Sequence, residues 1–168
     1  MEDASITVCE KDGVAYLRID GKGSFKNARY VKSFAEKMME LGVGRFVFDM
    51  QACTFMDSTF MGILAALAIQ LKKTTPTLLN LVNVSAANLE RLQNLGLLSL
   101  LDVTEGQIVL KADPFSTIAE ANQQPSKEQI AQTMLQAHQA LVEVEPKNAL
   151  KFEDVITYLG EKLGVKDA

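Results

Sequence analysis

The sequence has few of the residues from which catalytic and metal sites are usually built. It contains one histidine, His138, and two cysteines, Cys9 and Cys53, which disfavours a histidine-rich metal site or an ordinary Ser-His-Asp arrangement in the body of the chain. The cysteines are not spaced as a redox or metal pair, and both lie among apolar neighbours, where a thiol is usually a small core residue. We therefore expect no metal, no cofactor and no enzymatic activity, a reducing compartment, and a surface or interface position for His138.

Excess positive charge and long apolar runs are also missing. The 17 basic residues are outnumbered by 21 acidic ones, for a net charge of −4, so no global positive field exists to attract a nucleic acid. No apolar run reaches the ~18 residues that a membrane span requires, and the N-terminus lacks a basic stretch followed by an apolar core. These absences predict a cytoplasmic protein that does not span a membrane and does not bind nucleic acid.

Strand and helix signals alternate through most of the chain. Apolar spacing predicts strands at 5–10, 14–20, 45–50 and 77–82 and helices at 28–41, at 58–73 and after Ser85. The order β-β-α-β-α-β-α favours a mixed sheet of four to five strands with crossover helices, an α/β fold. Residues 21–27 and 51–56 are expected to be loops. Segments 98–103 and 107–110 could each add an edge strand, and their pairing is left open.

The composition changes after Asp113. A short helix led by proline is expected at 115–120, followed by a polar linker at 121–125. Ser126 and Gln129 then form a capping-box pattern ahead of the first of two apolar stripes, which predicts an αα-hairpin. The stripes comprise Ile130, Met134, Ala137 and Leu141, and then Phe152, Val155, Ile156, Leu159 and Leu163. An isolated helical pair is marginal in water, so these faces must be buried on the same domain, on a second copy or on another protein, and we favour a homodimer.

The most informative segment is Phe46–Gly62, which reads FVFDMQACTFMDSTFMG. It places a buried strand, a short loop and a hydroxyl-rich helix start in succession, with Asp57, Ser58 and Thr59 as good N-cap residues. Backbone N–H groups at a helix N-terminus lack internal partners and favour a negative charge, so Ser58 could carry a phosphate without unfolding the helix. The alternative is that Ser58 only caps the helix.

This segment resembles the signature of the STAS anti-sigma factor antagonists, in which a buried strand ends in Asp and a Phe-Met/Leu-Asp-Ser-Ser/Thr sequence starts the next helix. Asp49 and Phe55–Thr59 match that pattern, and Leu81–Ser85 with the leucines up to Gly96 is similar to the family's NVSP…GL strand and helix. The resemblance covers Ile6–Phe115 and implies a STAS-type sheet packed with helices at 1–120, with a C-terminal helical extension at 121–168. Phe60 departs from the family, because it stands where a small Gly is common, and it could enlarge a contact surface or pack inward.

The resemblance also implies a function. In the family, the serine after that aspartate is phosphorylated by a serine kinase that also acts as the anti-sigma factor, and a phosphatase removes the phosphate. Ser58 would then be the phosphoacceptor, with Thr59 the second candidate, and phosphorylation would weaken partner binding. The implied partner-binding residues are Ser24, Asp57, Ser58, Thr59, Phe60 and Met61. The alternative is a constitutive STAS scaffold or subunit of a signalling or lipid-transport assembly, with Ser58 only a helix cap.

Overall fold

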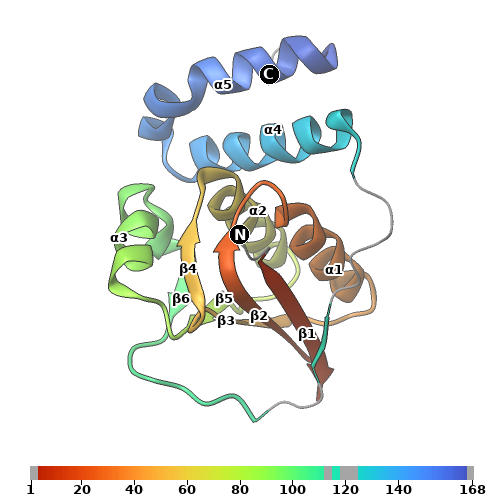
Figure 1. Ribbon diagram of the computed structural model, residues 1–168, viewed down its shortest axis with the longest axis vertical. Helices are drawn as coiled ribbons and strands as arrows, with labels where there is room; N and C mark the ends of the chain where they lie inside the picture. The colour runs from red at the N-terminus through yellow and green to blue at the C-terminus, as the bar shows by residue number, and fades with distance from the viewer. Residues whose placement is uncertain (1–3, 112–114, 118–124, 166–168) are drawn as a thin grey trace.

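A mixed β-sheet forms the body of the protein in the computed structural model, which describes residues 4–111, 115–117 and 125–165 (Figure 1). The spatial strand order is β6-β5-β3-β2-β1-β7, and β4 pairs with the end of β2. β1 is antiparallel to β2 and β7, and the remaining pairs are parallel. The strands are β1 (Ser5–Lys11), β2 (Val14–Gly23), β3 (Arg45–Asp49), β4 (Cys53–Met56), β5 (Leu79–Val82), β6 (Leu101–Val103) and β7 (Ser116–Thr117).

The sequence explains the centre of the sheet directly. Asp12 and Gly13 both have positive φ angles, 53° and 78°, as a two-residue hairpin turn between β1 and β2 requires. β3 lies between two parallel neighbours and buries Phe46 and Phe48, because crossover helices cover parallel strands and leave them little contact with water. The predicted α/β fold with a mixed sheet is confirmed, with short edge strands in addition to the predicted ones.

Three helices connect the strands: α1 (Ala28–Glu40), α2 (Ser58–Lys72) and α3 (Ala86–Asn94). The Ser85 side chain accepts a hydrogen bond from the backbone N–H of Asn88, which confirms the predicted cap. After α3 the chain reverses at Gly96, whose φ of 71° lies in the left-handed region that favours glycine. A short 3₁₀ turn, η1 (Leu97–Ser99), then leads into β6.

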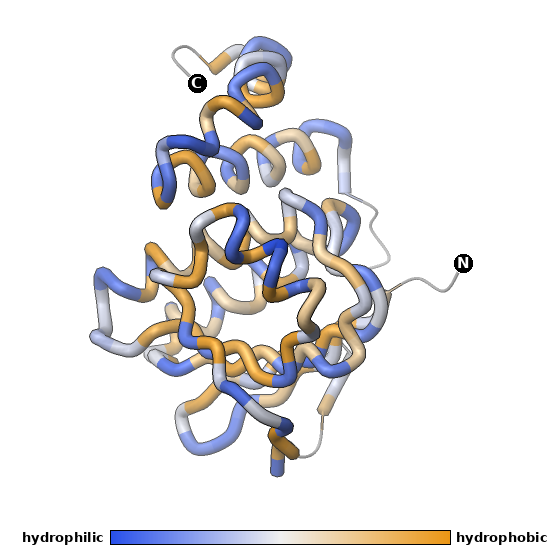
Figure 2. Tube along the Cα trace, turned by 90° about the vertical axis from the view of Figure 1, so that its left-hand side faces the viewer, coloured by the Kyte–Doolittle hydropathy of each residue, from blue (hydrophilic) through white to orange (hydrophobic). Residues whose placement is uncertain are grey.

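The C-terminal hairpin consists of α4 (Lys127–Val144), the 3₁₀ turn η2 (Pro146–Asn148) and α5 (Ala149–Leu163). The capping box of Ser126 and Gln129 is present, as predicted. α4 lies across α2 and α5 lies on α4, so the hairpin stacks on the body as two further layers (Figures 1 and 2). None of the helices in the described ranges is both long and apolar enough to cross a membrane.

The two sides of α4 are buried against different elements. Ala137, Ala140 and Leu141 join the main core, whereas Ala131 and Leu135 form a second cluster with Leu159 of α5. The buried amide of Asn148 donates to the carbonyls of Leu95 and Leu141, at 2.9 and 2.8 Å, and so fastens the hairpin to the end of α3. Burial within the same chain therefore supplies the partner surface that α4 needs. The homodimer stays a prediction, as does the domain division at 120/121.

Three local predictions were wrong in whole or in part: the loop at 21–27, whose first three residues belong to β2, the loop at 51–56, and the helix at 115–120. Cys53–Met56 is a strand rather than a loop, because β2 runs on to Gly23, beyond its pairing with β3, and offers a free edge. Ser116–Thr117 pairs with the outer edge of β1, so the helix expected at 115–120 does not begin there, and residues 118–120 lie outside the described residues.

Of the two candidate edge strands, only the first is a strand, and it is limited to residues 101–103. Residues 107–110 form no strand, and the Ile108 backbone instead bonds to the Asn83 side chain. The expected linker lies mostly outside the described residues.

Candidate functional site

Asp57 connects the start of α2 to the turn between β2 and α1. Its Oδ1 accepts from the backbone N–H of Phe60 at 2.8 Å, and its Oδ2 accepts from that of Phe25 at 2.8 Å. Its own N–H donates to the carbonyl of Gly23 at 2.9 Å. Asp57 is therefore the N-cap of α2, and its carboxylate fixes the neighbouring turn in place.

The turn at residues 24–27 is held by its own side chains. The Asn27 Oδ1 accepts from the backbone N–H of Ser24 at 2.9 Å, and the Ser24 hydroxyl accepts from that of Lys26 at 3.3 Å. Asn27 also donates to the carbonyl of Lys22 at 2.8 Å. Because Asp57 bonds to both Gly23 and Phe25, the structure brings Ser24 to the same end of the molecule as Ser58.

Ser58 is the first residue of α2 and is half-buried, while the cap itself is Asp57. The interpretation of Ser58 as a helix cap was therefore wrong, since its side chain bonds elsewhere. The Ser58 Oγ lies 2.9 Å from the Nε2 of His138, whose Nδ1 lies 2.6 Å from the carbonyl oxygen of Met134. A carbonyl oxygen can only accept, so Nδ1 carries a proton. In the neutral imidazole, Nε2 then accepts from the Ser58 hydroxyl.

His138 was not singled out as a site residue from the sequence, where a surface or interface position was expected. It is 3% exposed, which rules out the surface position, and it lies at an interface within the chain. Its ring meets that of Phe152 edge to face at 5.0 Å between centroids. The nearest sequence signal is its place beside Ala137 and one turn after Met134 on the α4 stripe, which shows that it faces inward but not that it meets Ser58.

The remaining predicted binding residues are buried, and other residues form the accessible surface. Thr59, Phe60 and Met61 are 3%, 1% and 5% exposed, so their side chains are not at the surface. Phe60 packs inward, and its ring lies so close to Gly23 that a Cβ there would meet it at 2.8 Å. The surface beside Ser58 is carried instead by two aromatic residues, Phe25 at 41% and Phe55 at 36% exposed, which were not predicted as contacts.

α2 and α4 approach each other very closely at Gly62. A Cβ built at Gly62 would collide with the backbone carbonyl of Ala137, so only glycine permits this approach of the two helices. Gly62 lies one turn after Ser58, and Ala137 directly precedes His138. The hydrogen bond and this close approach therefore belong to one crossing of α2 and α4.

Cys53 lies in β4, near the site. Burial raises the pKa of the Cys53 thiol, and hydrogen bonds with backbone groups of Gly23 and Phe55 offset part of that rise. A thiol that stays protonated is a poor nucleophile, and the side chain is 3% exposed. In the described part of the chain, no group of three or more His, Cys, Asp or Glu side chains is placed to hold a metal ion.

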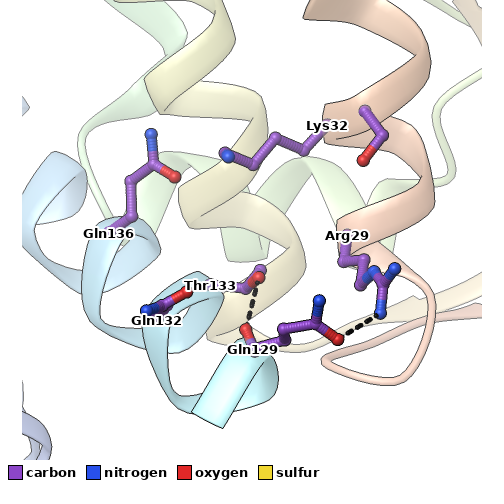
Figure 3. Close-up of a pocket in the computed structure, with 7 residues that line it drawn as sticks. Arg29, Lys32, Gln129, Gln132, Thr133 and Gln136 are labelled. Carbon is purple, nitrogen blue, oxygen red and sulfur yellow. Dashed lines mark hydrogen bonds between the residues drawn. The ribbon is translucent and has the colours of Figure 1, made fainter. Parts of the chain in front are cut away.

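A second contact of α4 with the body is polar. Arg29 of α1 donates to the Oε1 of Gln129 at 3.1 Å across a cleft of about 220 Å³ (Figure 3). Lys32 lines the same cleft but pairs with Glu36 at 3.5 Å. The start of α4 thus meets α1 through solvated side chains, whereas its middle meets α2 through small apolar ones.

Comparison with known proteins places the larger part of the chain in a family. Residues 5–121 match the family model of the STAS domain, and the chain belongs to that family. No curated protein matches the sequence. Among solved structures, a candidate anti-sigma factor antagonist of Thermotoga maritima, TM1081, is similar with a TM-score of 0.54 and 14% identity, covering 59% of this chain and 85% of that one. The anti-sigma factor antagonist SpoIIAA in its unphosphorylated form is similar with a TM-score of 0.51 and 13% identity, covering 61% of this chain and 89% of that one.

Proposed function

We propose that this protein is a regulator that binds a protein partner and is switched by phosphorylation of Ser58. The partner is an anti-sigma factor or a related serine kinase, and a serine phosphatase reverses the modification. Its work is binding and not turnover. The proposal is supported by membership of the STAS family and by the likeness of the fold to the structures of SpoIIAA and TM1081.

The observation that carries the proposal is the position of Ser58. It is the first residue of α2, it is half-buried, and it follows a cap whose carboxylate is fully engaged by the backbone. Four backbone N–H groups at a helix N-terminus lack intrahelical partners, and the helix dipole favours negative charge there. A phosphate on Ser58 is thus compatible with a folded α2.

The surface around Ser58 supports partner binding. Phe25, in the turn before α1, and Phe55, in β4, are both exposed, and the Arg91 guanidinium lies over the Phe55 ring at 4.5 Å from its centroid. Aromatic residues that remain exposed are enriched in protein interfaces. Phosphorylation would add about −1.5 to −2 charges beside this surface, and a loss of only ~1.4 kcal/mol would weaken binding tenfold.

A constitutive scaffold is the second candidate, and the hydrogen bond of Ser58 to His138 favours it. A hydroxyl that already bonds to a buried side chain has a structural role without any modification. In that case the aromatic surface would bind its partner whatever the state of Ser58.

Two measurements separate these candidates. Mass-spectrometric site mapping of the protein purified from its own host should find phosphate on Ser58. Recovery of a kinase-type or anti-sigma partner by the wild-type chain should be lost with Ser58→Asp and retained with Ser99→Asp, which adds the same charge at an exposed serine elsewhere. Equal recovery by all three proteins, with no phosphate on Ser58, would establish the scaffold instead.

A further inference from the structure

The hydrogen bond between Ser58 and His138 joins two segments that are 80 residues apart in the sequence. Ser58 is in the family domain, and His138 is on the C-terminal hairpin. We propose that this bond is a latch: the modification state of Ser58 determines whether α4 stays docked on α2. The latch rests on the proposed function in one respect, namely that Ser58 is the residue that is modified.

The hydrogen bond between Ser58 and His138 supplies a buried polar atom with its partner. Within the described residues, every buried side-chain nitrogen or oxygen has a hydrogen-bond partner. Phosphorylation replaces the Ser58 hydroxyl proton by phosphorus, so Oγ becomes an ester oxygen that no longer donates to Nε2 of the nearly buried His138 ring. A buried polar atom that loses its partner bears its full desolvation penalty.

The crossing of α2 and α4 leaves little space for a phosphate. The crossing of α2 and α4 is so tight that the backbone of Ala137 occupies the place of a side chain on Gly62. Residues four apart share one helix face, so a phosphate on Ser58 would be attached one turn from this contact and on the same face. Close-packed contacts of this kind do not deform gradually, and the added group must turn to solvent or displace α4.

A phosphate on Ser58 acts differently on α2 and on α4. Negative charge at the first turn of α2 stabilises α2 through the helix dipole. The lost hydrogen bond to His138 and the volume of the phosphate act instead on the crossing with α4. Modification is therefore expected to loosen α4 while α2 and the sheet stay intact, which is a local opening and not unfolding.

Hydrogen–deuterium exchange of the full-length protein measures this directly. With Ser58→Ala, which removes the donor alone, amides of residues 127–144 should exchange about fivefold faster, the effect of one ordinary hydrogen bond. With Ser58→Asp the acceleration should exceed tenfold, and amides of residues 46–49 should keep their wild-type rates. Ser58→Thr retains a hydroxyl and should stay near the wild type.

A double-mutant cycle tests whether the effect passes through His138. If the bond is the latch, Ser58→Ala should add nothing to the acceleration caused by His138→Leu, because partners in one contact are not additive. Fully additive rates, a wild-type rate for α4 in Ser58→Asp, or a uniform rise that includes the sheet would each overturn the latch. None of these measurements needs a kinase or a partner. Failure of the phosphorylation proposal would appear instead as absence of phosphate from Ser58 in the host, with the coupling of Ser58 to α4 unchanged.

Discussion

α1 and α2 are neighbouring helices of the same body, yet their compositions differ sharply. α1 has one apolar side that buries Val31 and Ala35, and its outer side carries ion pairs between Lys32 and Glu36 and between Lys37 and Glu40. α2 has no charged residue between its cap and Lys72, and it is buried on nearly all sides. A helix with one apolar stripe needs one covered face, whereas a helix that is apolar all round needs two.

The second cover of α2 is the C-terminal hairpin. The sheet and α1 account for one side of α2, and α4 accounts for the other (Figure 1). The family domain and its extension therefore share a core, since Ala137, Ala140 and Leu141 belong to the same cluster as Leu64. The extension therefore completes the body and also covers the helix that begins with Ser58.

The largest effect is expected from truncating a side chain in the middle of α2. Leu64 is fully buried, so Leu64→Ala should lower the free energy of unfolding by about 2–5 kcal/mol. The matched change on α1 is Met39→Ala at a half-buried position, which should cost less than about 1.5 kcal/mol because part of its surface already meets water. Urea denaturation of the full-length proteins measures both. Equal losses would show that α1 is as central as α2 and would remove the basis of the comparison.

The next effect concerns the crossing of α2 and α4. In a helix, Gly→Ala ordinarily gains about 1 kcal/mol in propensity, but a Cβ on Gly62 collides with the backbone of Ala137. Gly62→Ala should therefore destabilise the protein by about 1–3 kcal/mol, the usual range for overpacking. At Gly44, by contrast, a Cβ would meet only the Thr75 side chain at 3.9 Å. Gly44→Ala should leave stability unchanged or raise it by up to about 1 kcal/mol, and thermal unfolding of both variants provides the test. A stable Gly62→Ala protein would mean that α4 does not dock as described.

The periodicity of the sequence predicted the parts of the fold that depend on local signals. Helices beginning at Ala28, Ser58 and after Ser85 and the capping box at Ser126 all follow from apolar spacing and side-chain caps. The strand 53–56 was missed because Cys53 and Met56 are buried while Thr54 and Phe55 between them are exposed, a pattern that does not alternate. β7 has two residues and exists only through its pairing with β1, so no local signal could reveal it.

The candidate site was predictable in its centre and not in its surroundings. Asp57 and Ser58 were found from the helix start and the family motif, but the position of His138 depends on how a distant helix packs. One further signal lies in the sequence itself: the unbroken apolar sequence from Phe60 to Ile69 exceeds what a single covered face requires. That excess predicts a further covering element, and the apolar stripe of the hairpin is the obvious candidate. The specific pairing of His138 with Ser58 still needs coordinates.

The smallest effect is expected on the outer side of α1. Lys32 and Glu36 form an i,i+4 pair at 3.5 Å with side chains 27% and 34% exposed. Such pairs contribute about 0.3–0.5 kcal/mol, and the order Lys before Glu is the weaker of the two orientations on a helix. Glu36→Gln should therefore change the free energy of unfolding by less than about 0.5 kcal/mol, and the difference should shrink further in 1 M salt, where the Debye length falls to about 3 Å. Urea denaturation at low and high salt measures this difference in the free energy of unfolding.

A loss above about 1 kcal/mol that persists in high salt would show that Lys32, which lines the cleft toward α4, helps to hold the hairpin. The outer side of α1 would then be part of the docking surface, and the contrast with α2 would be one of degree.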